Sequence, residues 1–489
     1  MVDLEIEQPF IHIFRTPSGH YIYDVNTNAI LKISKNTYEC LEKKNYSDAG
    51  VLPEIKDLVN QGYLKSRHVE ESYNPITPYI HQYLDTKVCN LVLQITQNCN
   101  LRCEYCAYSG SYKNRIPSNK RMTFEVAAKA IDFVISHSEE AEQFYIGFYG
   151  GEPLLEFPLI KRCVDYANRQ CEGRKIKYHL TTNATLLYKE IVEYLMENDF
   201  DVLISLDGPE PIHDKYRKFA ASSKGSYQQV MESINEIRKI SQDYFKNHIR
   251  FNAVLDYESS FEDVACFFTN GDLFEKDMWQ LSEISTRYIC DVKSVSDTYI
   301  EEYEYALFKY YLYKLKRIKK TSGTIFNGQF EYLKRFMERF ETLKQTELPP
   351  KWHHGGPCVP GIVRLFVDTD GKMFPCERVS EVSEIACIGN VYDGWNYENI
   401  LQMLNLEKAT SEKCRNCWAY QYCTTCIGDA DGITHISGSH ICNHCNEVLR
   451  SVEAQMKDYV VLRELGYSSE SEFLQVLYGE ENESNTVPL

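Results

Sequence analysis

The stretch of sequence that decides the fold runs Gln97-Asn98-Cys99-Asn100-Leu101-Arg102-Cys103-Glu104-Tyr105-Cys106. Its three thiols stand at a three-then-two spacing inside a short loop. Three such close cysteines cannot form a normal set of disulfides, and they are one ligand short of a closed tetrahedral zinc site or a fully thiolate-ligated cubane cluster. The loop therefore indicates an iron-sulfur cluster with one open iron, and three reduced structural thiols are the alternative interpretation.

The residues before the loop predict a strand. Cys89 to Thr96 is an apolar-rich, β-prone run, so the cysteines follow the carboxyl end of a strand. From about residue 87 to residue 295, strand-like and helical runs alternate, which indicates βα units and a parallel sheet. The further expected strands are 144–149, 176–180, 202–207, 249–255 and, near the end of this region, 278–284. The carboxyl ends of such strands are where α/β barrels build their active sites.

The loop resembles the signature of the radical S-adenosylmethionine (SAM) superfamily, Cys-x3-Cys-x2-Cys with an aromatic residue before the last cysteine, a place that Tyr105 fills. The resemblance implies an α/β fold, an open (β/α)6 TIM-like barrel. It also implies a [4Fe-4S] cluster on Cys99, Cys103 and Cys106, with SAM chelated at the open iron. One-electron reduction of SAM would release a 5'-deoxyadenosyl radical that abstracts substrate hydrogen.

A glycine-rich turn follows the second expected strand. Gly150, Gly151, Glu152 and Pro153 alone would indicate an ordinary turn, but about 45 residues after a three-cysteine loop they match the superfamily's site for the methionyl amine of SAM. By the same resemblance, Ser205 and Arg217 are expected to contact the SAM ribose and carboxylate. Asn183 is a weaker candidate for a contact with the cofactor. Arg217 as an ordinary surface cation is the alternative.

A second group of cysteines lies in the last third of the chain. Its members are Cys358, Cys376, Cys414, Cys417, Cys423, Cys426, Cys442 and Cys445. Paired Cys-x2-Cys turns bind either zinc or iron-sulfur clusters, so spacing leaves the metal open. The order Cys-x12-Gly-x4-Cys, then Cys-x2-Cys-x5-Cys-x2-Cys, then a last cysteine, resembles the SPASM domain of radical SAM maturases, which implies two auxiliary [4Fe-4S] clusters.

The resemblance assigns the distal cluster to Cys414, Cys417, Cys423 and Cys442, and the nearer one to Cys358, Cys376 and Cys426. The pattern departs from the family's in two places: no second cysteine closely precedes Cys358, and the Cys423 to Cys426 spacing is one residue short. The nearer cluster thus lacks a fourth cysteine, takes Cys445 or Cys387, or keeps an iron free for a substrate thiolate. Glu377 holds a place where some relatives carry a carboxylate that acts as a base; a surface carboxylate is the alternative.

The N-terminal residues predict a separate module. Strands are expected over 10–15, 20–25 and 29–33, followed by helices over 35–44 and 52–61. A hairpin followed by helices resembles the winged-helix elements that capture the leader of a ribosomally made peptide as an added strand. A plain packing domain and a DNA-binding winged helix are the alternatives.

The expected organisation is a recognition element over 1–75, a radical SAM core over 87–295, a helical bridge over 296–350, a SPASM domain over 351–450, and a C-terminal helix with an acidic tail over 451–489. A polar linker is expected near 70–78. The other seven cysteines are expected to be buried packing residues, namely Cys40, Cys89, Cys163, Cys171, Cys266, Cys290 and Cys387.

Composition limits the partners. The net charge of −17 argues against nucleic acid and anionic membrane as partners, and it favours a peptide that carries basic residues. The start of the chain shows no basic segment followed by an apolar one, and no run is long enough to cross a bilayer, so a cytoplasmic location is expected. An electron donor such as flavodoxin or ferredoxin is implied by the resemblance.

The residues and the resemblance together predict a peptide-modifying radical SAM oxidoreductase that joins a cysteine sulfur to a carbon in a precursor peptide with a leader segment. Sulfatase-maturase-type oxidation of serine or cysteine is the second enzymatic interpretation, and carbon-carbon crosslinking and epimerisation stay open. A non-catalytic iron-sulfur or zinc protein that binds peptides is the alternative from another class.

Overall fold

The computed structural model describes residues 7–44, 52–108, 112, 118–171, 173–269, 274, 278–288, 295–343, 345–354, 356 and 358–467. Cys290 and the acidic tail from Ser468 lie outside these residues. The chain divides into two compact units. One comprises 1–69, 306–350 and 449–489, and the other comprises 70–305 and 351–448.

The larger unit is built on one ten-stranded sheet, in the order β10-β9-β8-β7-β6-β5-β12-β13-β14-β15. Its first six strands in that order pair in parallel. In chain order they are β5 (Asn90–Thr96), β6 (Gln143–Gly150), β7 (Lys175–Thr182), β8 (Phe200–Ser205), β9 (Ile249–Leu255) and β10 (Trp279–Glu283). The six strands expected from residues 87 to 295 are confirmed, and so is the α/β barrel fold class.

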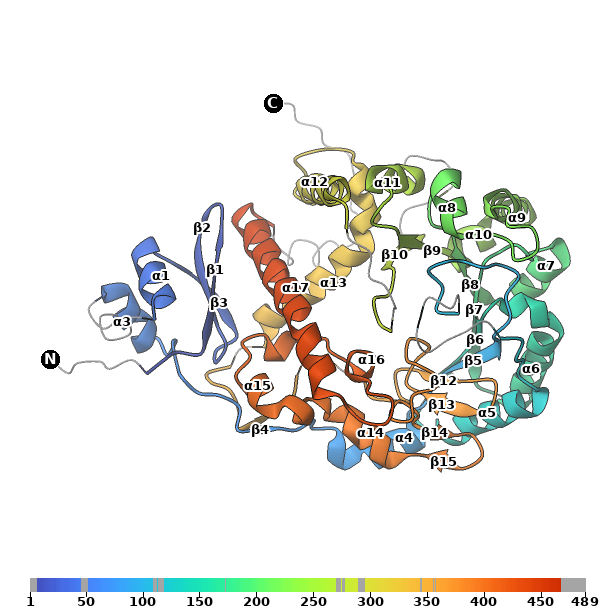
Figure 1. Ribbon diagram of the computed structural model, residues 1–489, viewed down its shortest axis with the longest axis horizontal. Coiled ribbons are helices and arrows are strands. Elements are labelled where there is room, and N and C mark those ends of the chain that lie inside the picture. The colour runs from blue at the N-terminus through green and yellow to red at the C-terminus, as the bar shows by residue number, and fades with distance from the viewer. Residues whose placement is uncertain are drawn as a thin grey trace. The chain divides into compact units, whose positions relative to one another are not determined.

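Helices cover one face of this sheet, as Figure 1 shows for α5, α6, α7 and α9. They are α5 (Phe124–Ser136), α6 (Phe157–Gln170), α7 (Lys189–Glu197), α8 (Glu210–Tyr216), α9 (Tyr227–Ile240), α10 (Gln242–His248) and α11 (Phe261–Thr269). The side chain of Thr123 caps α5 by accepting from the Val126 N–H, and the helix buries residues at three- and four-residue spacing. Alternate strand residues, such as Ile146 and Phe148, are buried and contribute to the core.

The C-terminal segment completes the sheet, which the sequence did not predict. Strand β12 (Leu365–Val367) pairs in parallel with β5, and β13 (Lys372–Phe374), β14 (Gly389–Asn390) and β15 (Gly394–Trp395) continue antiparallel. Three residues are too few to show a strand period. The remaining helices of this segment are α14 (Tyr397–Leu404), α15 (Ser411–Arg415), α16 (Ile427–Ala430) and α17 (Gly438–Glu464).

The segment expected to be a polar linker, near 70–78, is partly structured. It contains β4 (Glu71–Ser72), which pairs in parallel with β11 (Lys351–Trp352), and it is followed by α4 (Ile80–Thr86). Asn74 is buried and its N–H donates to Asn405 Oδ1 at 3.0 Å. Because β4 pairs with a strand almost three hundred residues away, its neighbours in the sequence do not indicate this pairing.

The smaller unit begins with an antiparallel sheet of β1 (Ile11–Thr16), β2 (Gly19–Asp24) and β3 (Ala29–Ile33), followed by α1 (Lys35–Glu42) and α3 (Pro53–Asn60). These elements follow the expected pattern closely. Ile22, Ile33, Leu41 and Ile55 form the core between sheet and helices. The two long helices expected over residues 296–350 are present as α12 (Asp297–Lys314) and α13 (Asn327–Thr342), but α12 ends six residues before the expected Lys320.

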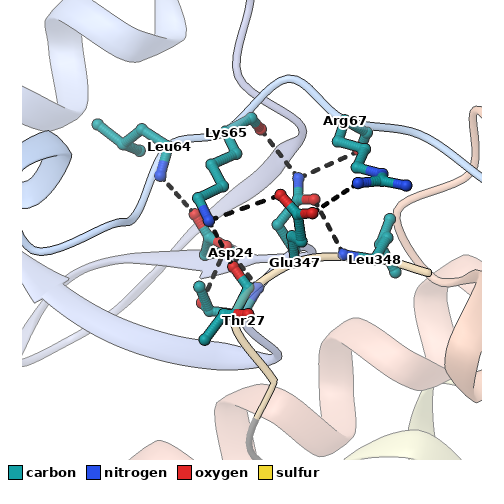
Figure 2. Close-up of polar contacts among 9 residues, drawn as sticks. Asp24, Thr27, Leu64, Lys65, Arg67, Glu347 and Leu348 are labelled. Carbon is teal, nitrogen blue, oxygen red and sulfur yellow. Dashed lines mark hydrogen bonds and ion pairs between the residues drawn. The ribbon is translucent and has the colours of Figure 1, made fainter.

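A polar cluster joins the first sheet to the segment after α13 (Figure 2). Asp24 accepts hydrogen bonds from the N–H of Thr27 at 2.8 Å and of Leu64 at 2.7 Å. Arg67 pairs with Glu347 at 2.5 Å, and the Leu348 N–H donates to Asn26 Oδ1 at 3.2 Å. Residues 24–27 are therefore fixed both to the end of the N-terminal segment and to residues 347–348.

We expect Asp24→Ala to lower the free energy of unfolding by about 1–3 kcal/mol, because it leaves the buried Leu64 N–H without an acceptor. Urea denaturation measures this loss. Asp57→Ala, at an exposed position of α3, is the matched control and should change little. Equal stability of the two variants would contradict the role given to this cluster.

Candidate active site

The glycine turn after β6 lies directly against the cysteine loop after β5. The Gly151 N–H donates to Thr96 O at 2.8 Å, and the Glu152 N–H donates to Asn98 O at 2.9 Å. A Cβ on Gly150 would stand 2.1 Å from Thr96 O, and one on Gly151 would stand 2.1 Å from Asn98 O. Gly150 also has a φ of +138°. Only glycine permits this approach, which holds the start of the loop to the second strand.

Glu152 binds groups of the chain itself. Its carboxylate accepts from the Leu154 N–H at 3.0 Å, the Thr182 hydroxyl at 2.8 Å and the Asn183 N–H at 2.8 Å. Burial raises the pKa of Glu152 to about 7, although the three donors oppose that shift. Glu152 thus ties the ends of β6 and β7 together, beside the buried Pro153. Its expected role in binding an amine remains a prediction.

The segment after α8 supports the middle of the cysteine loop. The Arg102 N–H donates to Lys218 O at 2.8 Å, and the Ala220 N–H donates to Asn100 O at 2.9 Å. Between them, Leu101 forms an isolated β-bridge with Phe219. The loop is therefore held by backbone bonds on two sides, from the glycine turn and from residues 218–220.

The three loop thiols influence one another electrostatically. Burial, with smaller contributions from neighbouring thiols, raises the pKa of Cys99 and of Cys103 to about 12, and Cys106 contributes to both shifts. Cysteine binds a metal as the thiolate, so a metal centre held here would have to deprotonate these thiols. Asn183, at the end of β7, places its Nδ2 3.7 Å from the Cys99 sulfur. The donor set therefore fits a cluster bound by three thiolates.

Among the residues that the structure describes, no three His, Cys, Asp or Glu side chains converge as the ligands of a single metal ion do. A cubane cluster takes each thiolate on a different iron, so its ligands stand farther apart than those of one ion.

Arg217 is buried in an ion pair with Asp207. Its Nε donates to Asp207 Oδ2 at 2.8 Å and its Nη2 donates to Oδ1 at 3.1 Å. The Tyr105 hydroxyl donates to the same carboxylate at 2.5 Å, and the guanidinium stands 5.4 Å from the centre of the Tyr105 ring. Because Arg217 lowers the pKa of Cys103, this cation lies within electrostatic range of the loop thiols. Because Arg217 is buried, the alternative of an ordinary surface cation is wrong. Ser205 ends β8, two residues before Asp207.

The second cysteine region contains two groups of thiols. In the first, Cys414, Cys417 and Cys423 interact electrostatically, and Cys445 on α17 raises the pKa of all three. Lys413 bonds to the thiols of both Cys442 and Cys445. This group contains three of the four expected distal ligands together with Cys445, while the choice between Cys442 and Cys445 as a fourth ligand stays a prediction.

In the second group, the thiol of Cys376 contributes to the raised pKa of Cys426, about 11, whose main cause is burial. Arg287 is near both thiols and forms a bidentate pair with Asp429 at 2.7 and 3.0 Å. Cys358 is exposed. Cys387 instead donates to Gly389 O at 3.3 Å and lines a cavity of about 470 Å³ beside β14 and β15.

The scattered cysteines divide by environment. Cys163 and Cys171 are buried, as expected of packing residues, whereas partial exposure is found at Cys40, Cys89, Cys266 and Cys387. The expectation of burial is therefore confirmed for two of them and wrong for four.

Glu377 is engaged by a cation. Arg364 Nη1 donates to its two carboxylate oxygens at 2.5 and 2.6 Å. A carboxylate held in this way must be released from the guanidinium before it can accept a proton from a substrate. The same pair influences His179 on β7, whose pKa falls to about 4 chiefly through burial. A Cβ on Gly147 would meet the His179 ring at 2.0 Å, so Gly147 makes room for this imidazole.

Six parallel strands carry a braced three-cysteine loop at the carboxyl end of β5, and the donor set of this loop fits an iron-sulfur cluster. Residues 93–264 match the family profile described as "Radical SAM superfamily". That segment is a radical SAM domain, and the family implies a [4Fe-4S] cluster and SAM.

Two curated relatives and one solved structure extend the comparison. The radical SAM cyclopropyl synthase TigE of Paramaledivibacter caminithermalis is 23% identical over 396 residues, 77% of each chain. A serine-type anaerobic sulfatase-maturating enzyme of Bacteroides thetaiotaomicron is 34% identical over 178 residues, 35% of this chain. The match spans only 42% of the Bacteroides enzyme's length. The structure titled "Native anSMEcpe with bound AdoMet" superposes with a TM-score of 0.53 at 20% identity, over 76% of this chain and 99% of that one.

The solved structure supports the fold, and the profile match supports a radical SAM domain over residues 93–264. Separately, no helix in the described part of the chain is long and apolar enough to cross a membrane.

We expect Gly151→Ala to destabilise the apo chain by about 1–3 kcal/mol, because its Cβ would collide with Asn98 O and displace the cysteine loop. Gly328→Ala, in α13 where an added Cβ meets nothing within 4 Å, is the control and should be neutral or slightly stabilising. Urea unfolding curves of the two variants check this. Indistinguishable curves would mean that the loop does not depend on the close approach.

Proposed function

We propose that this chain is a radical SAM maturase that installs thioether crosslinks, cysteine sulfur to carbon, in a ribosomally made precursor peptide. The observation that carries the proposal is the pairing, within one compact unit, of a braced three-cysteine loop with a second set of thiols that includes Cys376 and Cys426. When bound, the loop cluster and SAM would supply the radical that removes a substrate hydrogen, and auxiliary [4Fe-4S] clusters would accept the surplus electron.

The chain's own residues would divide the remaining work. The turn from Gly150 to Pro153, with Asn183, would position SAM at the ends of β6 and β7. The buried Arg217–Asp207 ion pair would hold one positive and one negative side chain at fixed positions beside Cys103. Glu377, once released from Arg364, would take the proton of a substrate thiol. A free iron near Cys376 would bind that thiolate.

The first sheet of the chain supports a peptide substrate. Within the described residues β3 lies at the edge of its sheet and pairs with β2, so its other side can accept a further strand. A leader peptide added there would gain main-chain hydrogen bonds, and the net charge of −17 favours basic residues in it. Flavodoxin or ferredoxin would donate the electron.

Oxidation of serine or cysteine is the second candidate, because a sulfatase-maturating relative is 34% identical over 178 residues. Carbon-carbon bond formation is a further candidate, because TigE matches over 77% of this chain. These reactions leave different products, so one mass-spectrometric experiment separates them.

The test co-expresses this chain anaerobically with a cysteine-containing peptide encoded by a short reading frame beside this one. We expect the peptide to lose two hydrogens and one alkylatable thiol for each crosslink formed. Loss of two hydrogens with every thiol still alkylatable would favour carbon-carbon bonding, or serine oxidation if a hydrazide captures an aldehyde. Cysteine oxidation to the aldehyde would instead remove sulfur. Either result would overturn the thioether assignment.

The leader proposal has a separate test by hydrogen–deuterium exchange. We expect the peptide to protect the amides of β3 (Ala29–Ile33) while β1 (Ile11–Thr16), at the opposite edge, serves as the internal control. Truncating the N-terminal module is a poorer test, because residues 24–27 and 64–67 bond to residues 347–348. Peptide binding that leaves β3 unprotected would exclude strand addition at this edge.

A further inference from the structure

One carboxylate, Glu381, receives hydrogen bonds from both flanks of the three-cysteine loop. Gln97, two residues before Cys99, donates from Nε2 to Glu381 Oε2 at 2.9 Å. Tyr108, two residues after Cys106, donates from its hydroxyl to Glu381 Oε1 at 2.6 Å. The two ends of the loop therefore meet at a single side chain that lies 273 residues from Tyr108 in sequence.

A buried glutamine completes this arrangement. Gln94 of β5 is 0% exposed, and its Nε2 donates to Glu381 Oε1 at 2.7 Å and to the Tyr108 hydroxyl at 2.5 Å. Its Oε1 accepts from Gln97 Nε2 at 3.2 Å and from the Thr369 N–H at 3.3 Å. The side chains of Gln94, Gln97 and Tyr108 thus each have a defined hydrogen-bonding direction, with Glu381 as their common acceptor.

The position of Glu381 in the chain gives the arrangement a consequence for function. It lies five residues after Cys376, in the segment between β13 and β14, whereas its three side-chain donors come from β5 and the cysteine loop. A shift of the Cys376 segment would therefore pull on both ends of the loop that should hold the SAM-binding cluster.

We propose that Glu381 is a positioning residue that clamps the two ends of the cysteine loop and sets its geometry from the Cys376 segment. Hydrogen bonds to a charged acceptor are shorter and stronger than bonds between neutral groups, so a carboxylate is suited to this task. The clamp itself is a property of the chain without cofactors, while its effect on SAM rests on the proposed function.

The first test uses the apo chain and the variant Glu381→Gln. This variant keeps the side chain's size but replaces one accepting oxygen by an NH2 group, which would face the donors of Gln94, Gln97 and Tyr108. We expect amide hydrogen exchange across residues 97–108 to become about tenfold faster. Glu384→Gln, the same change at an exposed position three residues on, is the matched control and should leave that exchange unchanged. Equal exchange in the two variants would overturn the clamp.

A reciprocal exchange separates positioning from general loss of structure. Gln97→Glu alone places two carboxylates together, so amide exchange across residues 97–108 should be faster than in Glu381→Gln. The double variant Gln97→Glu/Glu381→Gln restores a carboxylate–amide pair at the same place, and exchange should return to within about threefold of the original rate. A double variant that exchanges faster than both single variants would contradict the pairing.

The third measurement is SAM affinity of the reconstituted enzyme. We expect Glu381→Gln to raise the Kd for SAM about tenfold at an unchanged iron content per chain, and Glu384→Gln to leave it unchanged. An unchanged Kd alongside faster exchange would overturn the link between the clamp and the cofactor. If the original chain binds no SAM at all, the proposed function fails, and the exchange comparison still decides the clamp because it needs no cofactor.

Discussion

The close approach of two backbone segments is the constraint on which the rest of the larger unit depends. Thr96 and Asn98 lie so near Gly150 and Gly151 that a Cβ at either glycine would stand 2.1 Å from a carbonyl oxygen. This contact fixes the start of the cysteine loop to the second strand, and residues 218–220 fix its middle. Glu152 then joins the ends of β6 and β7. The loop thiols consequently stand at one end of a rigid sheet, where a cluster bound by three of them would face SAM.

A second consequence of the fold is that the C-terminal cysteine segment is continuous with the barrel. Strand β12 extends the parallel sheet beside β5, so Arg364, just before β12, and Cys376 and Glu377, just after β13, adjoin the sheet that carries the cysteine loop. The Arg364–Glu377 pair and the Arg287–Asp429 pair bring two cations close to the thiols of Cys376 and Cys426. Burial nevertheless raises the pKa of both thiols, and the arginines oppose this shift while their carboxylate partners add to it.

Sequence alone predicted the elements whose signal is local. The six parallel strands and the first three-stranded sheet are marked by local apolar, β-prone runs, and the cysteine loop and glycine turn follow from the spacing of a few residues. The contacts that join distant segments left no such signal. Strand β12 is three residues long, Asp207 reads as an ordinary strand end, and Glu381 reads as one more surface glutamate. The pairing of Arg217 with Asp207 and of Glu377 with Arg364 likewise required coordinates, because neither partner is marked by its neighbours in sequence.

The most direct test of the central claim is anaerobic SAM cleavage by the reconstituted full-length chain with dithionite as reductant. The account predicts that 5'-deoxyadenosine forms, and that the triple variant Cys99→Ala/Cys103→Ala/Cys106→Ala forms none while retaining the iron held by the second cysteine region. Absence of 5'-deoxyadenosine from the original chain, or its persistence in the triple variant, would contradict the assignment of radical generation to this loop.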